Sequence, residues 1–188
     1  MRFQKIEEDA SHRPYYLVTV GNTQLIFEVK ELTKDKNFGV VDNPSAPHLK
    51  RHSRIPGQHV RKRIQSSQKQ LQYGAEQGIP STLLIYNSLD PVFQMFGTED
   101  TDFIAAMDGE YTMLLDKTTG TISEVFNGRE QSFQECKNTS FSAVGRLSDC
   151  AGQLRVTLFE NVFAKVQLPF EVMQPCFDVR RIGGLAGP

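Results

Sequence analysis

The stretch Leu25-Ile26-Phe27-Glu28-Val29-Lys30-Glu31-Leu32 decides the fold of this 188-residue chain. Its β-branched and aromatic residues predict a strand, and residues i and i+2 of a strand project from the same face. Glu28 and Lys30 therefore point in the same direction, although packing requires neither charge and an unpaired buried charge is costly. Two interpretations stay open. Either an edge strand directs both charges into solvent, or an acid and a lysine together hold a divalent cation.

A hairpin is predicted around the turn that precedes this stretch. Tyr15–Val20 and Thr23–Val29 are both rich in strand-forming residues, and Gly21-Asn22 lies between them. A Gly-Asn pair between two such runs is typical of a two-residue hairpin loop. That register places Tyr16 opposite Phe27. The polar residues 1–14 before it are expected to be frayed.

The same register can be continued away from the turn. It puts Tyr15 opposite Glu28 and Arg13 opposite Lys30. Directly opposed residues of an antiparallel pair share a face. The sequence therefore predicts one surface that holds all four side chains.

A crossover unit follows the hairpin. Thr33–Gly57 has few signs of regular structure and is expected to be a long loop. Gln58–Glu76 has apolar residues near helical spacing, and Ser81–Tyr86 is an apolar run typical of a strand that is buried on both faces. Strand, helix and strand in this order predict parallel pairing with a right-handed connection.

Further elements are expected in the second half of the chain. They are short helical pieces at 90–96 and 102–107, a hairpin from 111–115 and 121–126, and a strand at 154–159. The predicted fold class is α/β (α+β mixed), with a central mixed sheet flanked by helices. Residues 1–182 are expected to form one domain, and residues 183–188 a disordered tail.

Composition favours a cytoplasmic protein with no membrane partner. Hydrophobic residues make up 39% of the chain and the formal net charge is −1, both ordinary for a globular protein. No apolar run reaches the length of a membrane span, and the N-terminus lacks the apolar core of a signal peptide. The three cysteines are odd in number and lack metal-ligand spacing, which favours a reducing compartment.

Charge is distributed unevenly. The stretch from His48 to Arg63 contains no acid, and its cations are Lys50, Arg51, Arg54, Arg61, Lys62 and Arg63. This block is a candidate nucleic-acid footprint, although a solvated loop leading into a helix would have the same composition. The stretch from Glu76 to Glu135 is acidic, which keeps open a protein-interaction role unrelated to nucleic acid.

The chain resembles the PD-(D/E)xK nucleases, also called restriction-endonuclease-like. The resemblance covers residues 12–90. It rests on Arg13-Pro14-Tyr15-Tyr16, on Phe27-Glu28-Val29-Lys30-Glu31, on the helix near Arg61-Lys62-Arg63-Ile64 and on the strand Leu83–Tyr86. It implies a restriction-endonuclease-like core and a hydrolase that cleaves phosphodiester bonds with Mg²⁺ or Mn²⁺. DNA is the expected substrate more than RNA, and relatives that pair their active sites suggest a homodimer.

The resemblance also implies residue roles. Glu28 would be a metal ligand, and the Val29 carbonyl would be a second ligand. Lys30 would position the attacking water and stabilise developing negative charge. Gln68 or Gln72, on the predicted helix, would help to orient the site.

One position departs from the family pattern. The family's aspartate should follow Pro14, but Tyr15 stands there, and a phenol is a poor Mg²⁺ ligand at neutral pH. Acids that could replace the missing aspartate are Glu7, Glu8, Asp9, Asp35 and Asp42. Two outcomes therefore stay open: an active nuclease, or a catalytically inactive module of the same fold that binds nucleic acid or a protein.

Overall fold

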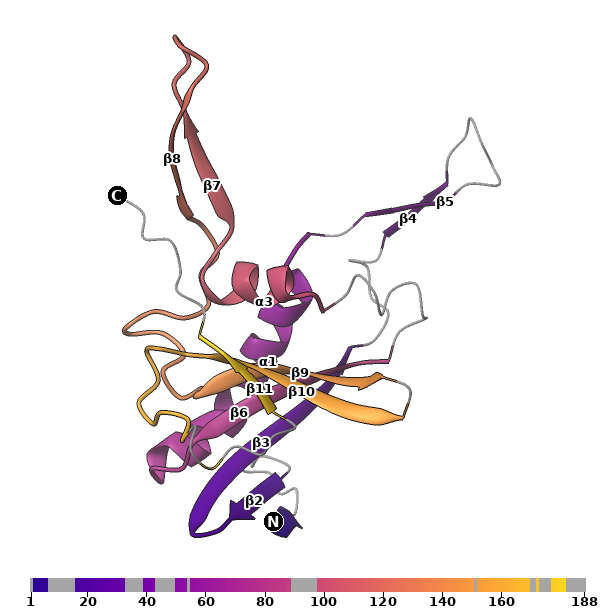
Figure 1. Cartoon of the computed structure of the whole chain (residues 1–188), viewed down its shortest axis with the longest axis vertical. Helices are drawn as coiled ribbons and strands as arrows, with labels where there is room; N and C mark the ends of the chain where they lie inside the picture. The colour runs from indigo at the N-terminus through magenta and orange to yellow at the C-terminus, as the bar shows by residue number, and fades with distance from the viewer. Residues whose placement is uncertain are drawn as a thin grey trace.

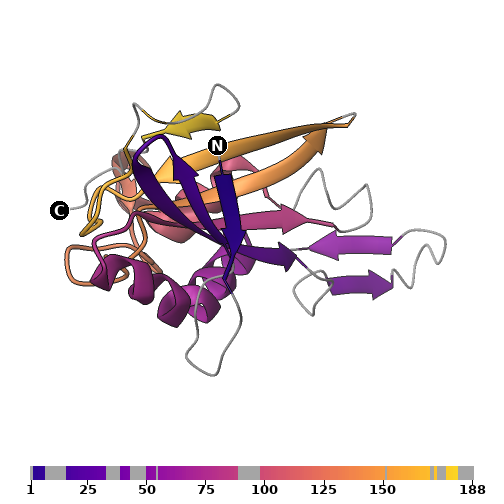
Figure 2. The same ribbon diagram turned by 90° about the horizontal axis from the view of Figure 1, so that it is seen from below.

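A seven-stranded mixed sheet forms the centre of the protein (Figure 1 and Figure 2), in the order β1-β2-β3-β6-β9-β10-β11. The computed structural model describes residues 2–6, 16–32, 39–42, 50–53, 55–88, 98–150, 152–169, 172 and 177–181. The strands of the sheet are β1 Arg2–Lys5, β2 Tyr16–Val20, β3 Thr23–Leu32, β6 Ser81–Asn87, β9 Ala143–Cys150, β10 Gln153–Glu160 and β11 Phe177–Arg180. The predicted central mixed sheet is therefore confirmed.

The predicted hairpin and crossover are both present. β2 pairs antiparallel with β3, and Tyr16 lies opposite Phe27. Gly21 supplies the left-handed conformation of the turn, with φ of 60°, which a glycine adopts at low cost. β3 then pairs parallel with β6, and the helix α1, Gln58–Glu76, connects them. The expectation of frayed residues before the hairpin is wrong for Arg2–Lys5, which pair with β2 as β1.

Both described helices cover the same face of the sheet. α1 and α3, Asp100–Met107, contribute Ile64 and Phe103 to a core with Ile26 of β3 and Phe159 of β10. Phe103 and Phe159 stack with ring centroids 4.5 Å apart. Even-numbered residues of β3 face this helix layer because alternate side chains of a strand leave opposite faces.

A glycine allows the two helices to approach each other. The Gly57 amide donates to the Asp102 carboxylate at 2.9 Å. A Cβ atom at Gly57 would lie 2.8 Å from the Ala106 nitrogen, and its φ is 73°. Position 57 therefore needs glycine both for space and for backbone conformation.

The other face of the sheet carries a second, smaller core. Leu25 and Phe27 of β3 pack there with Leu84 of β6 and Leu158 of β10. Phe27 stacks on Phe177 of β11 with centroids 6.2 Å apart. β3 and β6 are therefore covered on both faces along most of their length.

Two ribbons lie outside the main sheet. β4, Gly39–Asp42, pairs with β5, Lys50–Ser53, so the expectation of an irregular loop over 33–57 is wrong for these residues. β7, Tyr111–Leu115, and β8, Ile122–Asn127, form the predicted hairpin. Figure 1 shows this hairpin projecting away from the sheet and helices.

Some predictions fall outside the described residues. These are the helical piece at 90–96 and the tail 183–188. Within the described part of the chain, no helix combines the length and the apolar character that crossing a bilayer would require.

Candidate active site on strand β3

Glu28 and Lys30 form an ion pair on a central strand of the sheet, with the carboxylate fully buried and the ammonium partly buried. The Lys30 Nζ atom lies 2.6 Å from Glu28 Oε1. Glu28 is fully buried, and 22% of the Lys30 side chain is exposed. β3 lies between β2 and β6, so the interpretation of an edge strand with two solvated charges is wrong.

The burial of this pair is costly. Removing two charges from water carries a desolvation penalty that their attraction offsets only with good geometry. Hydrophobic neighbours on the same strand face, Ile26 and Leu32, pack against the helix layer without such a cost. A buried carboxylate and ammonium at this position point to a functional requirement more than to stability.

Helix α1 supplies further polar groups to the same layer. A Cβ atom at Gly74 would lie 2.7 Å from Ile26 Cδ1, which fixes how the helix sits over β3. The helix runs antiparallel to β3, and four helical residues advance about as far as two strand residues, roughly 6 Å. From this spacing we infer that Gln70 lies near the level of Glu28 and Ser67 near the level of Lys30.

Gln70 and Ser67 carry buried oxygen atoms. Gln70 Oε1 and Ser67 Oγ have no hydrogen-bond partner among the described residues. Buried polar atoms in proteins are nearly always satisfied, so such atoms call for an explanation. Neither residue stands out in the sequence, because their burial depends on where α1 packs against β3.

The two glutamines that the resemblance suggested lie elsewhere on α1. Gln68 and Gln72 are exposed. Gln68 Nε2 donates a hydrogen bond to the side chain of Asn138. Asn138 lies between β8 and β9 in the chain, so this contact directs Gln68 away from β3. Their suggested part in the site stays a prediction, and Gln70 is better placed for it.

The Val29 carbonyl is directed away from β6. The Ile26 amide donates to the Pro80 carbonyl at 2.8 Å, so even-numbered residues of β3 make the hydrogen bonds to β6. In a parallel ladder the intervening residues direct their N–H and C=O groups to the other side. The Val29 carbonyl therefore faces the β2 side of β3. The described pairing of β2 with β3 ends at Tyr16 opposite Phe27, so no described residue of β2 pairs with Val29.

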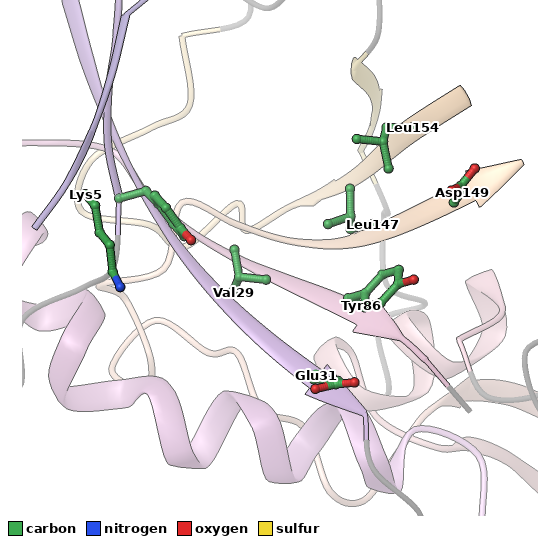
Figure 3. A pocket seen from close by; sticks show the side chains of 8 residues that line it. Lys5, Val29, Glu31, Tyr86, Leu147, Asp149 and Leu154 are labelled. Atoms are coloured by element: carbon green, nitrogen blue, oxygen red, sulfur yellow. The ribbon is translucent and has the colours of Figure 1, made fainter. Parts of the chain in front are cut away.

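The Val29 side chain belongs to a different feature. It lines a pocket of about 520 Å³ on the face of the sheet opposite to Glu28. Figure 3 shows Val29, Tyr86, Leu147 and Leu154 around this pocket, with Glu31, Asp149 and Lys5 near its edge. The sheet separates the pocket from the Glu28–Lys30 pair.

The basic block is divided among different environments. Lys50 and Arg51 belong to β5, whereas Arg54 lies outside the described residues. Lys62 is exposed on the first turns of α1, and Arg63 is half-buried there. Lys62 also lines a pocket of about 500 Å³, which Arg129 and Gln58 share.

Arg61 departs from the expected role in phosphate contact. Its side chain is buried, and its Nη2 donates to the Ala105 carbonyl at 2.7 Å. Its Nε donates to the Glu130 carbonyl at 3.1 Å. The guanidinium therefore joins α1 to α3 and to the segment after β8, because its rigid set of donors fits several carbonyls at once.

A complete metal-ligand set is not found in the described part of the chain. No group of three histidine, cysteine, aspartate or glutamate side chains gathers there in an arrangement that could hold a metal. Arg13 and Tyr15 lie outside the described residues. Glu28 and the Val29 carbonyl are hard oxygen donors of the kind that Mg²⁺ prefers, and this cation keeps several waters when protein ligands are few. The donors that are present therefore fit such an ion in chemistry.

Comparison with family models, curated proteins and solved structures finds no match for this chain.

Proposed function

We propose that this protein is a divergent metal-dependent nuclease that hydrolyses phosphodiester bonds in DNA. The observation that carries the proposal is the ion pair on the central strand β3, in which Lys30 Nζ lies 2.6 Å from the fully buried carboxylate of Glu28. Further support comes from the order of elements, in which the hairpin strand with Glu28 leads through a helix into a parallel strand. That order is the one the family resemblance implies for residues 12–90.

Each residue has a distinct part in the proposed chemistry. Glu28 and the Val29 carbonyl would hold Mg²⁺ or Mn²⁺. When bound, the metal would acidify a water molecule and polarise the phosphate. Lys30 directs an ammonium to the same point, where it would orient the attacking water and stabilise negative charge that develops on the phosphate. Gln70 would offer its buried oxygen as an acceptor for that water.

A second carboxylate is still needed for tight metal binding. The candidates Glu7, Glu8, Asp9 and Asp35 lie outside the described residues, and Asp42 belongs to β4. In the proposed enzyme one of these acids takes the place that Tyr15 occupies in the sequence pattern.

Metal binding and DNA cleavage test the proposal together. Calorimetry should detect Mg²⁺ or Mn²⁺ binding by the unmodified protein and its loss in Glu28→Gln, and the same substitution should abolish cleavage of DNA. Glu31→Gln is the matched control, because Glu31 is exposed on the opposite face of the same strand. Loss of both properties in Glu28→Gln but not in Glu31→Gln is the expected result.

The unfolding temperature distinguishes an ion pair that is kept for catalysis from one that stabilises the fold. Glu28→Gln alone would leave the Lys30 ammonium without its partner and is expected to be destabilising in either case. The informative variant therefore replaces both partners, as Glu28→Gln with Lys30→Met. A pair kept for function is commonly a cost to stability, so this double variant should unfold at the same or a higher temperature. If it instead unfolds at a clearly lower temperature and the unmodified protein binds no metal, the pair is structural and the proposal fails.

The second candidate is a catalytically inactive module of the same fold that binds nucleic acid. Tyr15 in place of an aspartate is the observation that favours it. This candidate predicts DNA binding that weakens steeply with salt, without cleavage, and metal binding only after Tyr15→Asp. The active candidate predicts metal binding without that substitution.

A further inference from the structure

The hairpin of β7 and β8 exposes an unusually apolar surface. Its large apolar side chains with high exposed fractions are Tyr111 at 58%, Met113 at 60%, Leu114 at 43%, Leu115 at 59%, Ile122 at 56% and Val125 at 43%. Contiguous exposed apolar surface of this kind marks interaction sites. A two-stranded hairpin that packs on nothing is also only marginally stable in water.

Strand register places five of these side chains, all except Leu114, on one face. Met113 lies opposite Val125. The register shifts between Leu114 and Leu115, and beyond this shift Leu115 lies opposite Ile122. Directly opposed residues share a face. Tyr111 is two residues from Met113 and so joins the same row. We name these five residues the apolar face of the hairpin.

The apolar face is held in a defined shape by hydrogen bonds at both ends of the hairpin. At its tip, Asp116 Oδ1 accepts the Thr118 amide at 2.7 Å and the Thr119 amide at 3.1 Å. At its base, the Gly128 amide donates to the Glu110 carbonyl at 2.8 Å. The surface is therefore preformed, which lowers the entropic cost of binding.

Charge is absent from the apolar face and present around it. Asp116 and Lys117 lie at the tip, and Glu124 lies opposite Leu114 on the reverse face. A surface without cations does not fit the phosphates of nucleic acid. A charged tip also disfavours insertion of the hairpin into a bilayer. The chemistry fits another uncharged apolar protein surface.

We propose that the apolar face binds the same face of a second copy of this chain, as a symmetric dimer. Identical faces of this kind match in length and bring no like charges together, as an isologous contact requires. The exposed fractions correspond to roughly 500 Å² per copy, so the pair would bury roughly 1,000 Å², the lower limit for a specific interface. The projection of the hairpin from the sheet and helices (Figure 1) leaves its face accessible to a partner ribbon. This inference is independent of the proposed nuclease activity.

Sedimentation velocity on the full chain, over a range of micromolar concentrations, tests the dimer. The unmodified protein should form a reversible dimer of twice its 21.2 kDa mass. Met113→Lys places a charge at the centre of the interface from both copies and should raise the dimer Kd roughly 30-fold or more. Leu114→Lys is the matched control, since Leu114 belongs to the same strand but to the reverse face and is 43% exposed.

The outcomes divide clearly. Loss of the dimer in Met113→Lys with retention in Leu114→Lys, at equal circular dichroism, supports the proposal. An unmodified protein that is monomeric over the whole range overturns it. A dimer that both variants weaken equally, or that neither weakens, also overturns it, because the interface then lies elsewhere.

Discussion

The hairpins β2–β3 and β7–β8 are both rich in apolar residues, but their apolar side chains differ in burial. In β2–β3, other strands pair on both sides, and Leu25, Ile26 and Phe27 are all buried. In β7–β8, the described strands pair only with each other, and Met113 and Leu115 remain largely exposed. Apolar residues and a turn are enough to form a hairpin, but neighbouring elements decide whether its side chains become core.

The same comparison separates two uses of a charged residue. Lys30 on the buried hairpin lies against Glu28, where water is largely excluded. Lys117 on the projecting hairpin is exposed at the tip. An ammonium in the first position interacts strongly with nearby charges, and one in the second position is screened by solvent. Chemistry is therefore expected on the buried hairpin and docking on the projecting one.

The largest expected difference between the hairpins is in their contribution to stability. Ile26→Ala removes a side chain that is 1% exposed in the main core, and should lower the free energy of unfolding by about 3 kcal/mol. Leu114→Ala truncates a side chain that is 43% exposed and should change it by about 0.5 kcal/mol or less. Urea unfolding at one fixed protein concentration measures both values. Equal losses would show that β7–β8 packs more tightly than its exposure indicates.

A smaller effect concerns the base of the projecting hairpin. Burial raises the pKa of Asp108 from 3.8 to about 6, and its Oδ2 has no hydrogen-bond partner among the described residues. The folded state therefore holds more protons than the unfolded state between these two values, and stability should fall as pH rises through that window. Because Asp108 is partly exposed, solvent screening reduces the expected loss to about 1–2 kcal/mol.

Asp108→Asn removes the titrating group while keeping the shape of the side chain. Unfolding midpoints measured from pH 4 to pH 7 should then lose that decline, and the variant should be the more stable protein at neutral pH. Glu135→Gln removes a carboxylate at an exposed position and serves as the matched control. A persistent decline in Asp108→Asn would assign it to another group.

The smallest effect is expected at the tip of β7–β8. The Thr119 and Thr118 amides lower the pKa of Asp116 by hydrogen bonding to its carboxylate. Asp116→Ala removes both bonds, so amide hydrogen exchange at these two threonines should accelerate. Exchange in β2 and β3 should stay the same, and so should the melting temperature, because the tip is exposed and far from the core. Slower or unchanged exchange would mean that the loop is held by its backbone alone.

Local sequence was enough to predict the hairpin register and the crossover. Gly21-Asn22 specifies a two-residue turn, and alternation along 23–29 then pairs Tyr16 with Phe27. The predicted strand Ser81–Tyr86 is β6, and its side chains are buried on both faces, as expected for a strand between β3 and β9. The same local signals identified β7 and β8. These elements could be predicted because their conformation depends mainly on residues that are adjacent in the sequence.

The remainder depends on contacts between distant segments. β9 pairs with both β6 and β10, and β11 adds parallel to β10, although neither strand has a strong pattern of its own. Arg61 resembles a surface cation in the sequence, but its guanidinium is buried, and the Ala105 and Glu130 carbonyls accept hydrogen bonds from it.

The candidate site combines both kinds of information. The sequence by itself determined that Glu28 and Lys30 project together, because side chains alternate along any strand. Only the tertiary structure decided that they lie in the interior and that Gln70 lies level with Glu28, because α1 covers β3 at a height set by the contact of Gly74 with Ile26. The tertiary structure likewise left the apolar face of β7–β8 uncovered within the described part of the chain. Burial is a property of what packs on a residue, and that is fixed by segments far away in the chain.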